Sequence, residues 1–334
     1  MNNDDRKISV VMCTYNGEHY LEEQLNSILS QSYPASEIMI VDDCSSDQTW
    51  DILLKYKEQY PDLFCCERNS KNVGYHINFV EALQKASGDF IAISDQDDIW
   101  KSDKLEVMIQ NIGDNFLLVS NSQVVDIYGK TIGKLYEKMN IQDFSLEKLI
   151  WENCIYGHSC MIHRTVVSLL YSCRGLSSHD YTIALICSSF GSIAVIDQEL
   201  QQWRRHSEAT TWHSQHANNE STKRRSGVYK AIAAFVSLLI LRKSVIVKDG
   251  FLKINEILDS LSDENGLTSN FEEIKNSTIL LSKQTLTSYL KVAFLCMRFR
   301  KNRNYYAEND DFKTKLITFS FVFRWWYDHR YSMS

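Results

Sequence analysis

Four residues with three carboxylates among them, Asp95-Gln96-Asp97-Asp98, carry the clearest chemical signal in this sequence. They directly follow the apolar run 90–94 and precede Ile99-Trp100, so predicted buried segments flank them on both sides. Carboxylates held this close repel one another unless a cation or a donor-rich ligand joins them. Mg²⁺ and Mn²⁺ prefer such oxygen ligands, completed by phosphate and water. The segment therefore predicts a divalent-metal site that binds a phosphate-bearing ligand.

Two other segments place polar side chains where they could join this site. Thr14-Tyr15-Asn16-Gly17 follows a predicted strand over 8–13, and Asp42-Asp43 follows a predicted strand over 37–41. In open parallel sheets, ligands bind beyond the carboxyl ends of the strands. Because all three polar segments end strands of the same predicted sheet, we expect them to line one rim.

The elements that position these residues are predicted from hydrophobic periodicity. Strands are predicted over 8–13, 37–41, 63–67 and 90–94, and helices over 18–30, 47–60 and 76–86. This alternation predicts an α/β fold with a mostly parallel sheet covered by helices. From about residue 115 the pattern predicts strands over 116–120, 155–162 and 192–196, with a helix over 181–190.

The last third of the chain reads as helices only. They are predicted over 228–247, 251–261, 285–299 and 313–327. We therefore predict a catalytic domain over 1–221 and a helical region over 222–334. Two stretches there, 229–243 and 289–303, combine apolar and basic residues. They predict either contact with an anionic membrane surface or a packed helical surface, such as a cap or an oligomer interface.

Composition narrows the class of protein. The net charge is −6, but residues 1–200 hold 29 acidic and 15 basic residues, whereas 201–334 hold 13 and 21. The acidic first part argues against nucleic acid as the ligand. Nine cysteines without a Cys-x-x-Cys pair indicate reduced thiols. The polar N-terminus and short apolar runs predict neither a signal peptide nor a membrane span, so we expect a cytoplasmic protein, associated with the inner face of the membrane if the basic helices bind it.

Other phosphate and nucleophile motifs are absent from the sequence. No Gly-x-Gly-x-x-Gly follows the first predicted strand, which disfavours a dinucleotide site. No Gly-x-Ser-x-Gly and no His-Glu-x-x-His occur, which disfavours a serine hydrolase and a zinc protease of those types.

The order and spacing of four segments resemble the family-2 glycosyltransferases, and most of all the bacterial branch that includes rhamnosyltransferases of surface polysaccharide synthesis. The segments are Val10 to Asn16, Ile40 to Asp47, Asn72-Val73-Gly74 and Ser94 to Asp98. Later motifs fit as well, namely Asn153-x-x-x-Gly157, Ser178-His179-Asp180-Tyr181 and Trp203-Arg204-Arg205-His206. The resemblance covers roughly residues 7–212.

The resemblance implies a GT-A fold, which is Rossmann-like with a mostly parallel sheet flanked by helices, here with an α-helical C-terminal extension. It also implies a nucleoside-diphosphate-sugar donor, Mg²⁺ or Mn²⁺ as cofactor, and inversion at the anomeric carbon. The implied function is transfer of a sugar, with rhamnose as one candidate, to a saccharide hydroxyl in bacterial cell-surface polysaccharide assembly. The expected partners are that donor and a saccharide or lipid-linked saccharide acceptor.

The same resemblance assigns roles to matching positions. Nucleotide-sugar binding is expected from Cys13, Tyr15, Asp43, Asn72 and Asp95, metal binding from Asp97 and His206, base catalysis from Asp180, and acceptor contact from Trp100 and His179. Cys13 departs from the pattern, which often has a hydroxyl residue there, and Tyr181 stands where tryptophan is frequent.

Several of these residues have a plain structural alternative. Asp180 could be only the N-cap of its helix, Trp100 could belong to the core, and Asn72 could shape its loop. His206 could be structural, and Asp98 could cap the turn that follows it.

The chemistry explains why such a site needs two carboxylates. The leaving nucleoside diphosphate gains negative charge, which a metal on Asp97 stabilises as a Lewis acid. The acceptor hydroxyl is a poor nucleophile, so a carboxylate such as Asp180 must accept its proton.

Two other functions remain open from the sequence. A sugar-1-phosphate nucleotidyltransferase also uses an acidic parallel sheet, but it needs a glycine-rich basic loop where this chain has Tyr15-Asn16-Gly17-Glu18. A non-catalytic carbohydrate-binding protein on the same fold would not need Asp43, Asp97 and Asp180 together.

Overall fold

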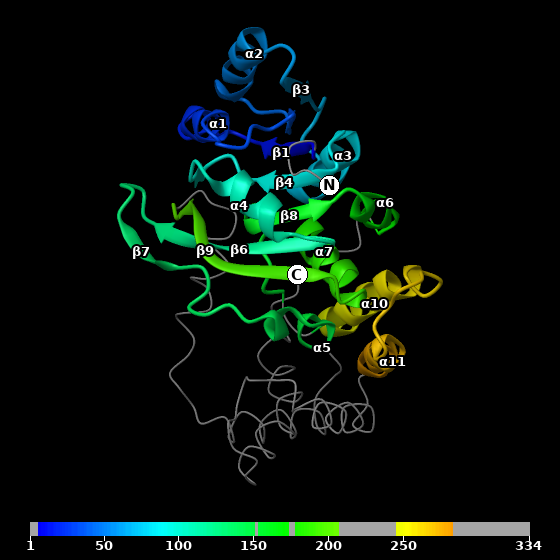
Figure 1. Cartoon of the computed structure of the whole chain (residues 1–334). Coiled ribbons are helices and arrows are strands. Elements are labelled where there is room, and N and C mark those ends of the chain that lie inside the picture. The colour runs from blue at the N-terminus through cyan, green and yellow to red at the C-terminus, as the bar shows by residue number, and fades with distance from the viewer. Residues whose placement is uncertain (1–5, 151–152, 174–177, 207–244, 283–334) are drawn as a thin grey trace, which may run out of the picture. The chain divides into compact units, whose positions relative to one another are not determined.

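The computed structural model describes residues 6–150, 153–173, 178–206 and 245–282 (Figure 1). These residues divide into two compact units. The first comprises the described residues up to Ile141 and from Cys154 to His206. The second comprises a short segment that begins at Gln142 together with the described helices after residue 244. The predicted boundary between 221 and 222 lies outside the described residues and stays a prediction.

The first half of unit one follows the predicted alternation. Its strands are β1 (Ile8–Thr14), β2 (Glu37–Asp42), β3 (Phe64–Arg68) and β4 (Phe90–Ser94), which run parallel in the order β3-β2-β1-β4. Its helices are α1 (Leu21–Leu29), α2 (Thr49–Gln59) and α3 (Tyr75–Lys85). The strands are buried along nearly their whole length in β1, β2 and β4. Strands covered on both faces need such continuous apolar runs, which is why the sequence predicted them well.

The second half of the sheet is mixed, where the sequence predicted a mostly parallel one. β8 (Cys160–His163) lies antiparallel between β4 and β6 (Leu117–Val125). β9 (Ile193–Arg204) runs parallel to β6 and antiparallel to β5 (Ile99–Trp100), and β7 (Thr131–Lys134) forms a hairpin with β6. The parallel prediction therefore holds for the first four strands and for the β6–β9 pair, whereas the other pairs are antiparallel, because the strand–helix alternation that supports the prediction ends near residue 95.

Several elements of unit one were not predicted. They are β5, β7, α4 (Lys104–Asn111) and α6 (Thr165–Ser172), whereas α7 (His179–Ser189) was predicted two residues later. In α4, Leu105, Met108 and Ile109 are buried together with Ile112. That spacing is typical of a helix face, so the sequence held a usable signal for α4.

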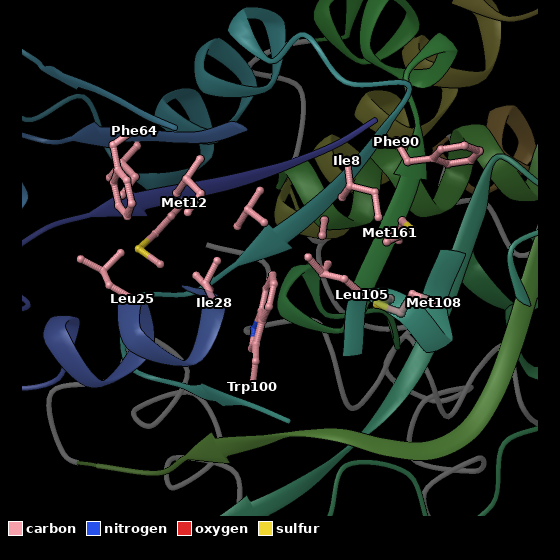
Figure 2. Close-up of a cluster of buried hydrophobic side chains, with 14 of the residues drawn as sticks. Ile8, Met12, Leu25, Ile28, Phe64, Phe90, Trp100, Leu105, Met108 and Met161 are labelled. Atoms are coloured by element: carbon pink, nitrogen blue, oxygen red, sulfur yellow. The ribbon is translucent and has the colours of Figure 1, made fainter. Parts of the chain in front are cut away.

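The core beneath the sheet fixes the strands that end at the candidate site. Figure 2 shows Met12 of β1 near Leu25 and Ile28 of α1, with Trp100 of β5 below them, and Ile8 of β1 near Phe90 of β4. All these side chains are buried. The ends of β1 and β4 are therefore supported by tightly packed side chains.

The second unit contains α10 (Val245–Ser260) and α11 (Phe271–Ser282), which pack against each other. They bury apolar residues that include Ile257, Leu258 and Phe271. α10 overlaps the predicted helix over 251–261, and α11 was not predicted. The helices predicted over 285–299 and 313–327, and most of the one over 228–247, lie outside the described residues. Among the described helices, none is both long and apolar enough to cross a membrane.

Candidate active site

A cavity of about 810 Å³ opens where β1, β2 and β4 end. Its walls also include the first residues of α3 and α7 and the segment after β9. The sequence-predicted residues that line it are Cys13, Tyr15, Asp43, Asn72, Asp95, Asp97, His179, Asp180 and His206. The fold thus brings together residues from six segments spread over nearly 200 positions.

The loop after β1 presents the Tyr15 ring, which is 48% exposed. The backbone of this loop forms hydrogen bonds with side chains on both sides. Tyr15 N donates to Gln96 Oε1 at 2.9 Å, and Asn16 N donates to Ser45 Oγ at 2.9 Å. Asn16 has a φ of 47°, a left-handed conformation that asparagine tolerates better than most residues. A fixed, exposed aromatic ring of this kind can stack on a flat ligand group.

Asp43 organises the loop that precedes α3. Its Oδ1 accepts from Asn69 Nδ2 at 2.8 Å and Val73 N at 2.9 Å, and its Oδ2 accepts from Gly74 N at 2.9 Å. A carboxylate has about four acceptor positions, so one remains for a ligand donor. Asn72 Oδ1 also accepts from Gly74 N, at 3.0 Å, which supports the loop-shaping alternative for that residue.

Cys13 lies beside these groups at the end of β1. Burial, followed by the charges of Asp43 and Asp95, raises the pKa of its thiol well above the ordinary value. The residue is therefore a neutral thiol in the cavity wall.

The acids after β4 have different surroundings. The Asp95 side chain is 40% exposed, and its Oδ2 lies 3.3 Å from Nδ1 of the buried His158. Although burial opposes ionisation, the hydrogen bond and charge of His158, with His179 and Lys104, hold the pKa of Asp95 below its ordinary value. Asp97 Oδ2 lies 2.8 Å from His206 Nε2. Both acids face the cavity, each with its own imidazole partner.

Asp98 lies behind the cavity wall and is fully buried. Its carboxylate accepts from Arg204 N at 3.2 Å and Gln201 Nε2 at 3.3 Å. Burial, then the charges of Asp97 and Asp95, raise the pKa of Asp98 well above its ordinary value. Asp98 thus joins β9 to the acidic segment, which replaces the expectation that it caps the following turn.

Two groups of side chains could bind a cation. Asp95, Asp98 and His158 offer ligand atoms within 4.8 Å of one another, and Asp97 with His206 offers a second pair. We favour the second for an ion that meets a diphosphate, because Asp97 and His206 both line the cavity whereas Asp98 does not. One carboxylate and one imidazole, completed by phosphate and water oxygens, suit Mn²⁺ and Mg²⁺. Nδ1 of His206 is buried and has no hydrogen-bond partner among the described residues, so one nitrogen of this imidazole is left unsatisfied by the protein.

Asp180 lies in the first turn of α7, next to His179. Ser178 occupies the N-cap position, so the alternative that Asp180 is only an N-cap does not hold. Its Oδ1 accepts from Tyr181 N at 2.7 Å. His179 is buried and stacks on Phe79, with ring centroids 4.3 Å apart. Burial lowers the pKa of His179, against the charges of Asp180 and Asp95, so its ring is neutral near pH 7.

Trp100 does not line the cavity, which corrects the expectation that it contacts the acceptor. It is 3% exposed, belongs to the core, and lies under Lys104, whose Nζ is 4.1 Å from the ring centroid. Ile99-Trp100 forms β5, and pairing with β9 turns the indole inward. The structural alternative for this residue is therefore the right one.

Other aromatic and imidazole side chains line the cavity that sequence reasoning did not single out. They are His19, Tyr20, Tyr75, Phe79, Tyr156, His158 and Trp203. His158 directly follows Gly157, and Trp203 begins the motif that contains His206. Both residues could thus have been predicted from their position within or next to a sequence motif.

Comparisons with known proteins show the family and the fold of this chain. The model of the family described as glycosyl transferase family 2 matches residues 9–170. The chain is 30% identical over 205 residues to the UDP-Glc:alpha-D-GlcNAc-diphosphoundecaprenol beta-1,3-glucosyltransferase WfgD of Escherichia coli, covering 58% of this chain and 74% of that protein. It is 40% identical over 103 residues to the putative teichuronic acid biosynthesis glycosyltransferase TuaG of Bacillus subtilis, covering 31% of this chain but only 40% of that protein.

Among solved structures, the crystal structure of S. aureus TarS 1-349 is similar with a TM-score of 0.50. The two chains are 20% identical, and the match covers 95% of this chain and 90% of that one. Likeness at this identity concerns the fold alone. The predicted GT-A fold is confirmed, with the mixed second half described above.

Proposed function

Since this chain belongs to glycosyl transferase family 2, we propose that it moves a sugar from a nucleoside-diphosphate sugar to a saccharide hydroxyl with inversion. One observation carries the proposal. One cavity is lined by an aromatic and acidic set at Tyr15 and Asp43, by the pair Asp97 and His206, and by Asp180. These are the groups that donor binding, leaving-group stabilisation and proton removal require.

The donor side of the proposal uses the residues at the ends of β1 and β2. The Tyr15 ring stacks on the base, and the spare acceptor position of Asp43 takes a base N–H. Cys13 and Asn72 complete this wall, and Asp95 accepts from ribose or sugar hydroxyls. Its lowered pKa keeps it an acceptor at neutral pH.

Asp97 and His206 would hold Mg²⁺ or Mn²⁺ against the diphosphate. When bound, the ion supplies Lewis-acid stabilisation of the leaving group's charge. The chain's own part is to hold a carboxylate oxygen and an imidazole nitrogen 2.8 Å apart in the wall of the cavity.

Asp180 acts as general base for the acceptor hydroxyl. A single displacement with proton transfer to a carboxylate inverts the anomeric carbon, because no covalent intermediate intervenes. His179 is neutral and packs beside Asp180, where it supports the acceptor side of the cavity.

The acceptor and setting are proposed from the relatives. One relative's name gives a diphosphoundecaprenol-linked acceptor, and another gives teichuronic acid biosynthesis. We therefore propose a saccharide or lipid-linked saccharide acceptor in cell-surface polysaccharide assembly, with rhamnose among the donor sugars to test. No observation of the described residues favours a nucleotidyltransferase or a non-catalytic role.

A donor panel tests this function. The purified chain with Mn²⁺ is expected to release nucleoside diphosphate from at least one of UDP-, GDP- and dTDP-sugars, and faster with a saccharide acceptor. Asp97→Asn and Asp180→Asn should each lower the rate at least ~100-fold, whereas Asp114→Asn, an exposed acid outside the cavity, should not. NMR of the product should show the inverted anomer. Absence of release from every donor, with Asp97→Asn binding donors as the wild type does, would refute the transferase role.

A further inference from the structure

Gln96 separates two cavity acids, and its side-chain amide pairs with the backbone of Tyr15. Tyr15 N donates to Gln96 Oε1 at 2.9 Å, and Gln96 Nε2 donates to Tyr15 O at 3.0 Å. Two opposed hydrogen bonds to one residue fix both distance and orientation, as they do between antiparallel strands. The Gln96 clamp, meaning these two hydrogen bonds, therefore joins the Tyr15 loop to the segment that carries Asp95 and Asp97.

Gly17 provides the space for this clamp. A Cβ at position 17 would lie 2.3 Å from Gln96 Oε1 and 2.6 Å from its Cδ. Gly17 does not have a left-handed φ, so space and not conformation requires glycine here. Any side chain at this position must push the amide away from the Tyr15 backbone.

The opposite side of the loop is held independently of Gln96. Asn16 Oδ1 accepts from Ser46 N at 2.9 Å, Gly17 N donates to Thr49 Oγ1 at 2.8 Å, and Glu18 N donates to Asp47 Oδ2 at 3.1 Å. Loss of the clamp should therefore leave the loop folded against the start of α2. What it should lose is its fixed position relative to Asp97.

We propose that Gln96 is a positioning residue that sets the separation between the base-binding ring of Tyr15 and the metal-binding Asp97. The inference rests on the proposed function. A nucleoside diphosphate carries its base and its diphosphate at opposite ends of the ribose, so both ends bind together only when the two contacts are correctly spaced. The clamp pre-organises that spacing, which strengthens binding without adding a contact to the ligand.

Glutamine suits the clamp better than glutamate or asparagine does. Its amide is both donor and acceptor, whereas glutamate loses the donor to Tyr15 O. Glutamate would also add a further negative charge beside Asp95 and Asp97. Asparagine is one methylene shorter and would not span the same gap.

The first test replaces Gln96 by methionine, which keeps the length and removes the amide. Kd values for UDP, GDP and dTDP with Mn²⁺ are measured by calorimetry. For the nucleotide that the wild type binds, Gln96→Met should raise Kd and donor KM about tenfold, the effect of ~1.4 kcal/mol. The kcat should stay within about twofold, because the clamp acts on binding. The control Gln59→Met, at an exposed helix position, should change neither constant.

The second test is a double-mutant cycle between Gly17→Ala and Gln96→Ala. Each single change should raise the nucleotide Kd about tenfold, since one displaces the amide and the other removes it. The double variant should be no weaker than either single variant, because the new methyl group then fills space left by the amide. A purely structural role would instead lower the melting temperature of the variants and leave KM unchanged.

Hydrogen exchange separates failure of this inference from failure of the proposed function. The Tyr15 amide of the ligand-free chain should exchange slowly in the wild type and at least tenfold faster in Gln96→Met. If exchange increases but no nucleoside diphosphate binds the wild type, the clamp exists and the proposed function is wrong. An unchanged Kd in Gln96→Met, or multiplicative effects in the double variant, would overturn the positioning role.

Discussion

Asp98 and Lys104 show how a crowded acidic site is kept in a folded core. Both side chains are fully buried. Lys104 Nζ donates to His158 O at 2.8 Å and contacts Gln201, whose Nε2 in turn donates to Asp98. Burial lowers the pKa of Lys104 to about 7, against the charges of Asp98, Cys160 and Asp95. The lysine and the raised pKa of Asp98 together offset the repulsion among three neighbouring acids.

Lys104→Met should therefore destabilise the chain by about 3 kcal/mol, because it leaves a buried carboxyl without its counter-group. Thermal unfolding measures the loss, and Lys101→Met, at an exposed position, provides the control. Lys104→Met combined with Asp98→Asn should recover part of the stability. If the double variant is no more stable than Lys104→Met alone, Lys104 and Asp98 are not coupled.

His76 predicts a pH dependence of stability. Burial, then the neighbouring His179, lowers the pKa of His76 to about 4, although Asp180 opposes the shift. Below its ordinary pKa of about 6.5, the unfolded chain takes up a proton that the folded chain refuses until about pH 4. The stability that the neutral His76 side chain contributes is therefore fully present above pH 6.5 and is lost as the pH falls to 4. His76→Gln should reduce the fall in melting temperature between pH 7 and pH 4.5 by about 2 °C. The control His19→Gln, at an exposed position, should leave this fall in melting temperature unchanged. An equal effect of both substitutions would show that His76 is not the source of the pH dependence.

At the scale of elements, the site depends on how strands and helices begin and end. β1, β2 and β4 deliver Cys13, Asp43 and Asp95 to one rim because their register is fixed along the buried sheet. α7 delivers Asp180 in its first turn, where the helix dipole favours a negative charge. β9 delivers His206 beside the acidic segment, where Arg204 N donates to Asp98 and Arg204 Nε donates to Asp97 O at 3.1 Å.

A substitution at Gly88 tests how closely the segment before β4 packs against β1. A Cβ at position 88 would lie 2.6 Å from Ser9 N and 2.9 Å from Lys7 O, which are backbone atoms at β1. Gly88→Ala must shift the β1–β4 pairing near Ser9 and should cost about 2 kcal/mol of stability. Gly133→Ala, where a Cβ meets nothing within 4 Å, is the matched control. Calorimetric unfolding compares the two variants, and equal melting temperatures would contradict the predicted clash.

At the scale of the whole molecule, the acidic catalytic part and the basic final third suit different partners. The apolar and basic stretches 229–243 and 289–303 lie outside the described residues, and membrane-surface contact remains our prediction for them. A site that uses a lipid-linked acceptor gains from being held at the membrane, because the acceptor is confined there.

Vesicle sedimentation tests this prediction with the full chain. Binding to vesicles that contain phosphatidylglycerol is expected, with little binding to pure phosphatidylcholine vesicles. Because electrostatic attraction is screened, raising the salt concentration from 0.1 M to about 1 M should release most of the protein. Replacing Arg298, Arg300 and Lys301 by glutamine should weaken binding while donor hydrolysis in solution is unchanged. Equal binding to both lipids would favour the alternative of a packed helical or oligomer surface.

The sequence by itself determined the first four strands and three helices, because parallel strands covered on both faces need continuous apolar runs that local patterns reveal. It also indicated most of the cavity residues, from Tyr15 to Asp180, because their motifs stand at the ends of those strands and helices. The structure places all of these residues along one cavity, and their chemical roles stay proposals.

Only the tertiary structure decided what depends on pairing between distant segments. Pairing of β5 with β9 turned Trp100 into the core, and the approach of β9 made Asp98 a buried anchor. His158 became the partner of Asp95, and Gln96 the clamp on Tyr15, across 63 and 81 residues respectively. Such contacts leave no periodic trace in a single sequence, because each is set by where two chain segments meet and not by the spacing of residues along either one.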